Sequence, residues 1–551
     1  MPLGAAKVAL LGAAGSGDAL TGYWTFLGDP TRASGQPASV YSEGGLYQTA
    51  AQLAAGNNEW LVIGRWTDQT GITGSSVAVI DGLRINGNAP ASGTISFNKG
   101  SWWSLGDGIN FQDRGSVIAE DGSGNLYINY AGYVGGTYNP PRFFSRMIKL
   151  NSSLAEQVAY SYKNSSNENE GLQRGVFLFM DDDLISVANS YLPQMFGTVK
   201  ISKSFNKHDT STLQESGTGY RILGNGNSDS ASQLFAAHIL QNTTSGTSGT
   251  TANGALQNYD DERGTTRPQI QLFQLTWNGT SASYNTTMDF TLASESTGGT
   301  DFYLSDMESN GNDIYTLGYG SATSVVSGTK NYGAICLHTW GGSAASVDFY
   351  VMKLQDGGKN ENMTPYAMCL DTANDAVYVQ GQSYNIGAAN AGLSSMWVAK
   401  IDLDASTKKP TTLAWINSYC NEDFGVYPKS GRHGIKLTAN DTITCFGWSQ
   451  NQANPSYTPA VISLLTIPRD GSAVDGSGTV GSCDVTSHDI SSYVLYQASA
   501  ASTNVTLSAS STGTTNMNLT SNNVLGAADA QGTSNYTTLD PDPVEYVNGG
   551  V

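Results

Sequence analysis

Two stretches, TANDAVYVQGQS (Thr372–Ser383) and TANDTITCFGWS (Thr438–Ser449), decide the fold class of this chain. Each begins with an Asn-Asp turn and continues as an alternating strand that ends in glycine and small or polar residues. A tight hairpin needs central residues that accept positive φ, and Asn, Asp and Gly do so most readily. Both stretches therefore predict a hairpin turn followed by a strand, at the same place in a repeated unit.

The same turn-and-strand pattern recurs along the chain, which predicts an internal repeat. The other copies are NNEWLVIGRW (Asn57–Trp66), DGSGNLYINYAG (Asp121–Gly132), DDDLISVANS (Asp181–Ser190), SASQLFAAH (Ser230–His238) and SNGNDIYTLGYGS (Ser309–Ser321).

A second pattern, an apolar strand that ends in a polar turn, follows each copy of the first. Its copies are SSVAVIDG (Ser75–Gly82), SRMIKLNSS (Ser145–Ser153), GTVKISKS (Gly197–Ser204), IQLFQLTWNG (Ile270–Gly279), FYVMKLQDGG (Phe349–Gly358), MWVAKIDLD (Met396–Asp404) and AVISLLTIPRDG (Ala460–Gly471). An upstream strand such as YAMCLD and a downstream strand such as TLAWINSY complete a unit of four strands.

Four-stranded units repeated around an axis are typical of a β-propeller, because stacked sheets cover each other's faces. We predict an all-β chain with a single propeller of seven four-stranded blades. Counts of six or eight stay open, since the fourth unit matches the pattern least well. A β-helix or a two-sheet stack is the structural alternative. The units are longer than common blades, so some loops must be long, and the Asn/Ser/Thr/Gly tract Gln241–Gln257 is predicted to be one.

The repeat divides the chain into three parts. Residues 45–482 carry the repeats and form the predicted propeller. Residues 1–44 lack the repeat and are predicted to be an N-terminal arm for attachment. Residues 483–551 are rich in Ser, Thr, Asn and Ala, and they predict a closing strand or small β extension followed by a weakly structured tail.

Composition restricts the classes of function. The chain of 551 residues has 27 basic and 46 acidic residues, which gives a net charge of −19. The electrostatic field of a negatively charged protein repels nucleic acid, so direct binding to nucleic acid is not expected. No apolar run is long enough for a membrane-spanning helix, so no membrane insertion is expected. The five cysteines form no C-x-x-C pair, and they are predicted to be small buried hydrophobic residues. No secretory leader is expected either.

Candidate ligand sites are few. The clusters Asp181–Asp182–Asp183 and Asp260–Asp261–Glu262 are candidates for binding Ca²⁺, although structural turns are the favoured interpretation. The adjacent Trp102 and Trp103 cannot both face one side of a strand, so one of them is a candidate for stacking on a sugar.

No linear motif of catalysis is present. The five histidines lack the spacing of a zinc site, and there is no G-x-S-x-G elbow, Walker loop or dinucleotide-binding glycine motif. We therefore expect no cofactor, no metal and no enzymatic activity. A pair of carboxylates for glycoside hydrolysis could be assembled only in three dimensions.

The N-terminal segment MPLGAAKVALLGAAG resembles the opening of many structural and tail-fibre-like proteins of marine bacteriophages. The repeat array is similar in style to virion β-propellers, such as those of the tail-nozzle proteins of short-tailed phages. The resemblance implies a tail component, such as a fibre, nozzle or accessory protein, made in the host cytoplasm and released by lysis. It also implies virion proteins as partners through residues 1–44, a host-surface glycan as ligand, and a homo-oligomer in the particle. The alternatives are a propeller enzyme that cleaves polysaccharide, as a hydrolase or lyase, and a secreted sugar-binding propeller.

Overall fold

The computed structural model describes the strands given below and short turns between them. Side chains are described chiefly in residues 120–127, 303–320, 332–339, 348–352, 363–383, 395–419, 434–437, 441–447 and 467–471. Within this described part, no helix is long and apolar enough to cross a membrane.

The described strands form seven antiparallel sheets of four to six strands and one sheet of two strands. Sheet 1 has β2 (Ser39–Tyr47), β3 (Glu59–Thr67), β5 (Leu83–Asn86) and β6 (Ile95–Phe97). Sheet 2 has β8 (Ile109–Asn110), β9 (Ile118–Glu120), β10 (Leu126–Val134), β11 (Arg142–Leu150) and β12 (Glu156–Asn164). Sheet 3 has β13 (Leu172–Met180), β14 (Asp183–Ser190), β15 (Met195–Ile201) and β16 (Thr218–Arg221). Sheet 4 has β17 (Leu234–Gln241), β18 (Thr250–Asp260), β19 (Arg267–Trp277), β20 (Ala282–Tyr284) and β21 (Thr287–Leu292).

The next three sheets continue in chain order. Sheet 5 has β22 (Phe302–Asn310), β23 (Asp313–Gly320), β24 (Tyr332–Trp340) and β25 (Ala345–Leu354). Sheet 6 has β26 (Thr364–Asp371), β27 (Ala376–Ser383), β28 (Ser395–Leu403) and β29 (Pro410–Asn421). Sheet 7 has β30 (Phe424–Pro428), β31 (Ile435–Thr438), β32 (Thr442–Asn451) and β33 (Val461–Pro468), and it is joined by β1 (Tyr23–Leu27). The two-stranded sheet has β4 (Ala78–Ile80) and β7 (Ser101–Trp103).

Six short strands near the C-terminus extend these sheets. They are β34 (Gly478–Val480), β35 (Cys483–Ser487), β36 (Tyr493–Ala498), β37 (Ala500–Val505), β38 (Leu519–Ser521) and β39 (Tyr546–Asn548). Five of them pair with the outermost strand of a sheet, and β34 pairs with β35.

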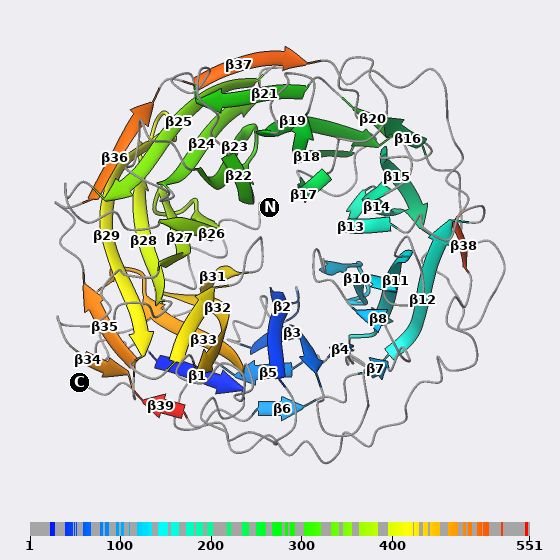
Figure 1. Ribbon diagram of the computed structural model, residues 1–551, viewed down its shortest axis with the longest axis horizontal. Coiled ribbons are helices and arrows are strands. Elements are labelled where there is room, and N and C mark those ends of the chain that lie inside the picture. The colour runs from blue at the N-terminus through cyan, green and yellow to red at the C-terminus, as the bar shows by residue number, and fades with distance from the viewer. Residues whose placement is uncertain are drawn as a thin grey trace.

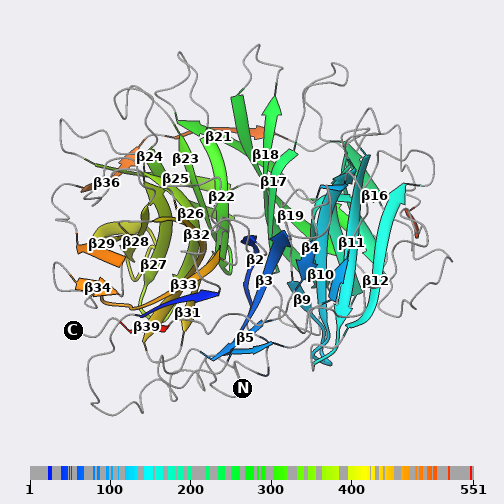
Figure 2. The same ribbon diagram turned by 60° about the horizontal axis from the view of Figure 1, so that its bottom comes forward.

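The sheets stand side by side in a ring, so the predicted all-β propeller architecture is confirmed. First strands such as β2, β13, β22 and β26 lie toward the centre, while β12, β25 and β29 lie toward the outside (Figure 1). Seen from the side, the strands run across the thickness of the ring (Figure 2). In sheets 1 to 6 the strands of each repeat follow one another in chain order from the centre outward, as four-stranded repeats require, whereas in sheet 7 β1 lies outside β33.

The sides of sheet 6 show why these strands lack a polar face. In β27, Val377 and Val379 pack toward sheet 5, in a cluster with Leu317 and Ile335. Ala376 and Tyr378, which alternate with them, pack toward sheet 7 in a second cluster. Because successive side chains point to opposite faces, a strand between two sheets is buried on both. Each fully buried apolar side chain contributes about 1.5–3 kcal/mol to stability.

The three cysteines whose side chains are described, Cys336, Cys369 and Cys445, are free and buried. Burial raises the pKa of each thiol, so all three stay protonated at neutral pH. The prediction that they act as small hydrophobic residues is confirmed.

The glycine near the end of β27 has a structural reason. In five sheets the innermost strand has a register shift against the second strand. In β26 the shift lies between Pro365, opposite Gly381, and Ala367, opposite Gln380. A Cβ on Gly381 would lie 2.1 Å from the Trp397 side chain and 2.6 Å from the Thr364 carbonyl oxygen. The strand can pass this point only as glycine.

Two assignments of the repeat pattern are wrong in sheet 4. SASQLFAAH contains the start of β17, which is the innermost strand rather than the second. The second strand is β18, and it begins inside the tract Gln241–Gln257 that was predicted to be a loop. This strand is built from small and polar residues, and Ala252 and Asn253 are nevertheless fully buried. Polar composition therefore concealed a strand, because the neighbouring sheets and not its own bulk provide the burial.

Two further assignments shift by one strand. SSVAVIDG contains β4, which pairs with β7, whereas the third strand of sheet 1 is β5. FYVMKLQDGG contains the end of β25, the fourth strand of sheet 5, and the third is β24. Apolar strands look alike in sequence when both faces are buried, so the pattern alone could not number them.

The expected N-terminal arm, residues 1–44, contains strands of the ring. Trp24 of β1 lies opposite Leu465 of β33, so the first described strand belongs to the sheet formed by the last repeat. Part of β2, the innermost strand of sheet 1, also falls within residues 1–44.

Candidate functional site

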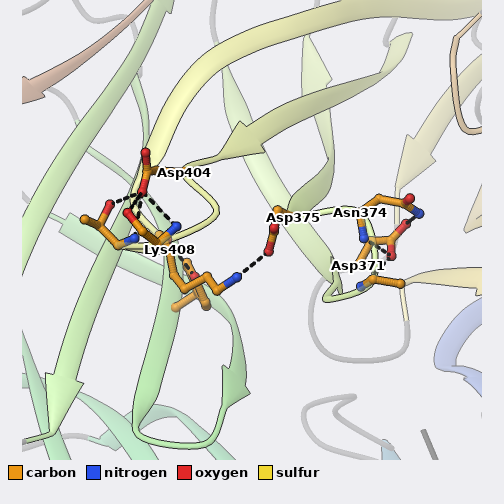
Figure 3. A network of polar contacts seen from close by, with 9 residues as sticks. Asp371, Asn374, Asp375, Asp404 and Lys408 are labelled. Carbon is orange, nitrogen blue, oxygen red and sulfur yellow. Dashed lines mark hydrogen bonds and ion pairs between the residues drawn. The ribbon is translucent and has the colours of Figure 1, made fainter. Parts of the chain in front are cut away.

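The densest described polar network lies at the turns of sheet 6 (Figure 3). In the turn between β26 and β27, the Asp371 carboxylate accepts hydrogen bonds from the main-chain nitrogens of Ala373, at 3.2 Å, and Asn374, at 3.3 Å. The Asn374 side chain donates to the same carboxylate at 2.9 Å. Asp375 has a φ of 47°, and its carbonyl oxygen accepts from the Leu403 nitrogen at 2.7 Å.

The second copy of the TAND sequence places its aspartate in the same conformation in sheet 7. Asp441 has a φ of 59°, and its carbonyl oxygen accepts from the Arg469 nitrogen at 3.0 Å. The shared sequence thus gives a shared left-handed residue and a shared main-chain bond to the end of the third strand. Asp is among the few residues other than Gly that adopt this conformation at low cost.

The turn between β28 and β29 supplies Lys408, the cation that faces Asp375 of the first TAND turn. Asp404 begins this turn and accepts hydrogen bonds from the hydroxyls and main-chain nitrogens of Ser406 and Thr407. These bonds, led by the one from the Ser406 hydroxyl, hold the pKa of Asp404 well below its usual range. Lys408, with a φ of 57°, places its ammonium 2.6 Å from the Asp375 carboxylate (Figure 3).

The turn after β33 supplies Arg469, the cation that faces Asp441 of the second TAND turn. Arg469 contacts the carboxylates of Asp371, at 3.0 Å, and Asp441, at 3.4 Å. Its Nε also donates to the Thr442 carbonyl oxygen at 3.4 Å. The Arg469 side chain is 10% exposed and that of Asp371 is 2% exposed, so this ion pair is buried between sheets 6 and 7.

Further contacts join consecutive sheets at these turns. Trp415 of β29 donates to the Arg469 carbonyl oxygen at 3.1 Å, and Asn417 donates to the Gly471 carbonyl oxygen at 3.0 Å. Between sheets 5 and 6, Tyr315 donates to the Lys408 carbonyl oxygen at 2.7 Å. Lys409 pairs with Asp348 of β25 at 2.9 Å, and this contact raises the pKa of Lys409.

A buried carboxyl joins the innermost strands of sheets 5 and 6. Asp306 of β22 accepts from its neighbour Met307 and from the Met368 nitrogen of β26, both at 2.8 Å. Ser305 donates to the Pro365 carbonyl oxygen at 2.7 Å. Burial, aided by the charge of Glu308, raises the pKa of Asp306 to about 8. This carboxyl is therefore mostly protonated at neutral pH.

A buried histidine lies further out in sheet 5. His338 of β24 has its Nε2 2.9 Å from the Thr316 hydroxyl. Burial lowers its pKa to about 3, so the ring is neutral at physiological pH. It behaves as a polar core residue.

These groups together define what the network does. The carboxylates of Asp371, Asp375 and Asp441 each accept hydrogen bonds or face a cation from a neighbouring turn, as described above. Among the described residues no group of three or more His, Cys, Asp or Glu side chains could hold a metal ion. The network is a junction that holds adjacent sheets at fixed positions.

The candidate residues from the sequence lie elsewhere. Trp102 and Trp103 fall in β7, where they pair with Val79 and Ala78. Asp183 begins β14 opposite Met180, and Asp260 ends β18 opposite Arg267. The side chains of these four residues lie outside the described part of the structure, as do Asp181, Asp182, Asp261 and Glu262 entirely. The proposals of a sugar site and of calcium sites stay predictions.

The residues that form the junction were not singled out in the sequence. The TAND repeats marked its two turns, but nothing in a single sequence connects Arg469 with Asp371, which precedes it by 98 positions. Asp306 also gave no signal, since it lies inside an ordinary strand pattern.

No protein-family model and no curated protein matches the sequence. Similar solved structures include the Penicillium chrysogenum α-L-arabinanase in complex with arabinobiose, with 7% identity, 64% of this chain and 94% of that chain covered, and a TM-score of 0.34. The periplasmic gluconolactonase of Pseudomonas aeruginosa has 11% identity, 81% and 96% coverage, and a TM-score of 0.32. The β-fructofuranosidase of Schwanniomyces occidentalis, in complex with fructosyl-erythritol, has 8% identity, 88% and 99% coverage, and a TM-score of 0.25.

These comparisons correct the expectation that the chain is not an enzyme, because all three similar structures are enzymes. The expectation rested on the absence of linear catalytic motifs, and residues brought together by a fold leave no such motif. None of the three is a phage protein, so the comparisons give the resemblance to phage tail proteins no support. At TM-scores this low, the likeness assigns no activity to this chain.

Proposed function

We propose that this chain is a structural component of a bacteriophage tail, a fibre, nozzle or accessory protein, whose propeller engages a host-surface glycan. The observation that carries the proposal is the joining of consecutive sheets by Arg469–Asp371, Lys409–Asp348 and Tyr315–Lys408. Such junctions make a rigid platform, and rigid platforms present binding loops at low entropic cost. The phage-like opening MPLGAAKVALLGAAG supplies the assignment to a virion.

The proposal also specifies the number of blades and the strand that closes the propeller. Sheets 1–7 are the seven blades of a single propeller, and β1 closes it as the outer strand of the seventh blade. The residues before β1 are the attachment segment for other virion proteins, and the mounted protein is a homo-oligomer. It is made in the host cytoplasm, leaves by lysis, and contacts neither nucleic acid nor membrane.

The experiment is cryo-electron microscopy of purified particles of the phage that encodes this chain. A seven-bladed ring on the tail, attached through the segment before Tyr23, is the expected result. Absence of the chain from particles would overturn the virion assignment. A ring of six or eight blades, or a ring open between β1 and β33, would overturn only the finer architecture.

A second candidate is a propeller that cleaves a polysaccharide, because a fold can bring together carboxylates that no linear motif reveals. Asp306 is fully buried, so its carboxyl cannot contact a substrate and has no part in this candidate. The test is release of reducing ends from host-envelope polysaccharide by the purified chain. Cleavage would establish this candidate, whereas glycan binding without cleavage would leave only a sugar-binding propeller.

A further inference from the structure

The strands after residue 482 lie along the outside of the ring in an order opposite to that of the sheets. β35 pairs with β29 of sheet 6, β36 with β25 of sheet 5, and β37 with β21 of sheet 4. Further along, β38 pairs with β12 of sheet 2, and β39 pairs with β1 in sheet 7. The orange and red strands in Figure 1 follow the circumference in this way. All five pairings are antiparallel.

Side chains anchor this segment where it passes between two sheets. Asp348 of β25 accepts a hydrogen bond from Gln497 of β36 on Oδ1, at 2.7 Å, and faces Lys409 of sheet 6 with Oδ2. One carboxylate therefore holds a blade, its neighbour and the C-terminal segment together. Leu495, also in β36, packs against the buried cluster between sheets 5 and 6.

The strands of this segment also touch the neighbouring sheet. β36 is paired with sheet 5 and contacts β29 of sheet 6, while β37 is paired with sheet 4 and contacts β25 of sheet 5. Each strand thus lies across the outer seam between two sheets. A segment that only extended one sheet would not make these contacts.

We propose that the strands β35 to β39 form an intramolecular belt, which covers the outer edges of sheets 2, 4, 5, 6 and 7 and prevents a second copy of this chain from adding strands there. An outer strand presents a row of main-chain N–H and C=O groups, and an uncovered row is a template for pairing with another chain. The belt uses these groups by the same antiparallel pairing that an intruding strand would use. The sequence of β37, AASTNV, has no charged residue that would oppose such pairing.

The first experiment tests the register of β36 against β25 and whether both strands come from the same chain. In Lys353→Cys/Val494→Cys the two cysteines lie directly opposite each other in β25 and β36, and a disulfide can span such a pair. The control, Lys353→Cys/Ala498→Cys, separates them by four residues along the strand. The expected result is a disulfide within one chain in the first variant and none in the control. Disulfide-linked dimers, or no disulfide in either variant, would overturn the proposal.

The second experiment tests the protective role with the same protein. The disulfide form of Lys353→Cys/Val494→Cys is held near its thermal transition, with and without a reducing agent, and self-association is followed by light scattering. The locked form is expected to associate several-fold more slowly than the reduced form. Wild type, treated with the same reductant, controls for effects on the native cysteines. Equal rates for the locked and reduced forms would show that the belt does not protect the edges.

Discussion

The two TAND turns have the same sequence, and Asp375 and Asp441 both have a positive φ, yet their carboxylates have different partners. In the first, Asp375 pairs with Lys408 of its own sheet, and both side chains are about 30% exposed. In the second, Asp441 is 79% exposed, and the arginine that faces it is buried because it reaches across to Asp371 of the neighbouring sheet. A local sequence therefore determines the turn, while the position of the cation determines whether the turn joins one sheet or two.

The strand after the first turn can be disrupted at Gly381. Gly381→Ala places a Cβ against Trp397 and the Thr364 carbonyl, so we expect a loss of about 4 kcal/mol in the free energy of unfolding. Urea denaturation measures it. The control is Gly122→Ala, where a Cβ meets no atom within 4 Å and little change is expected. Equal stability of the two variants would contradict the register of β26 and β27.

The buried arginine is the next largest expected effect. Arg469→Met leaves Asp371 without its cation between two sheets, which costs about 3 kcal/mol because a buried charge loses its partner. Arg469→Lys keeps the charge but cannot reproduce the planar fork, so an intermediate loss is expected. Thermal unfolding of the three proteins gives the order. If Arg469→Met were as stable as wild type, the ion pair between Arg469 and Asp371 would not contribute to stability.

The buried carboxyl of Asp306, on an inner strand, differs from the carboxylates of the turns because it makes stability depend on pH near neutrality. Its pKa is about 8 when folded, above its ordinary value of 3.8, so its contribution to stability is present at low pH and is lost as pH rises between these values. This gives a fall of at most about 1.4 kcal/mol per pH unit in the free energy of unfolding. Asp306→Asn is expected to remove this slope in urea denaturation between pH 5 and 8. An unchanged slope would show that Asp306 is ionised in the folded protein.

The smallest expected loss of stability follows from breaking the partly exposed ion pair between Lys408 and Asp375. Lys408→Met removes the partner of Asp375 where solvent screens both charges, so the loss should be about 0.5 kcal/mol. The same melting assay, repeated in high salt, checks it, since salt should reduce the difference between wild type and variant. A loss as large as that of Arg469→Met would mean that exposure does not distinguish the two junctions.

The sequence predicted the all-β propeller because its hairpin turns carry residues that accept positive φ, and Asp375 and Asp441 are such residues in the structure. It misplaced β18, since burial there is provided by neighbouring sheets rather than by bulky side chains. The junction could not be predicted for a related reason. Arg469 and Asp371 meet only when two sheets stand side by side, and no spacing in the chain encodes that contact.

The pairing of β1 with β33 also has a consequence for the timing of folding during synthesis. Trp24 and Leu465 are opposite each other but 441 positions apart in the chain. At a translation rate of about 5–20 residues per second, the ribosome needs roughly 20–90 seconds to make the strand that β1 awaits. During that interval β1 cannot pair with β33, so it is available to a chaperone that binds nascent chains.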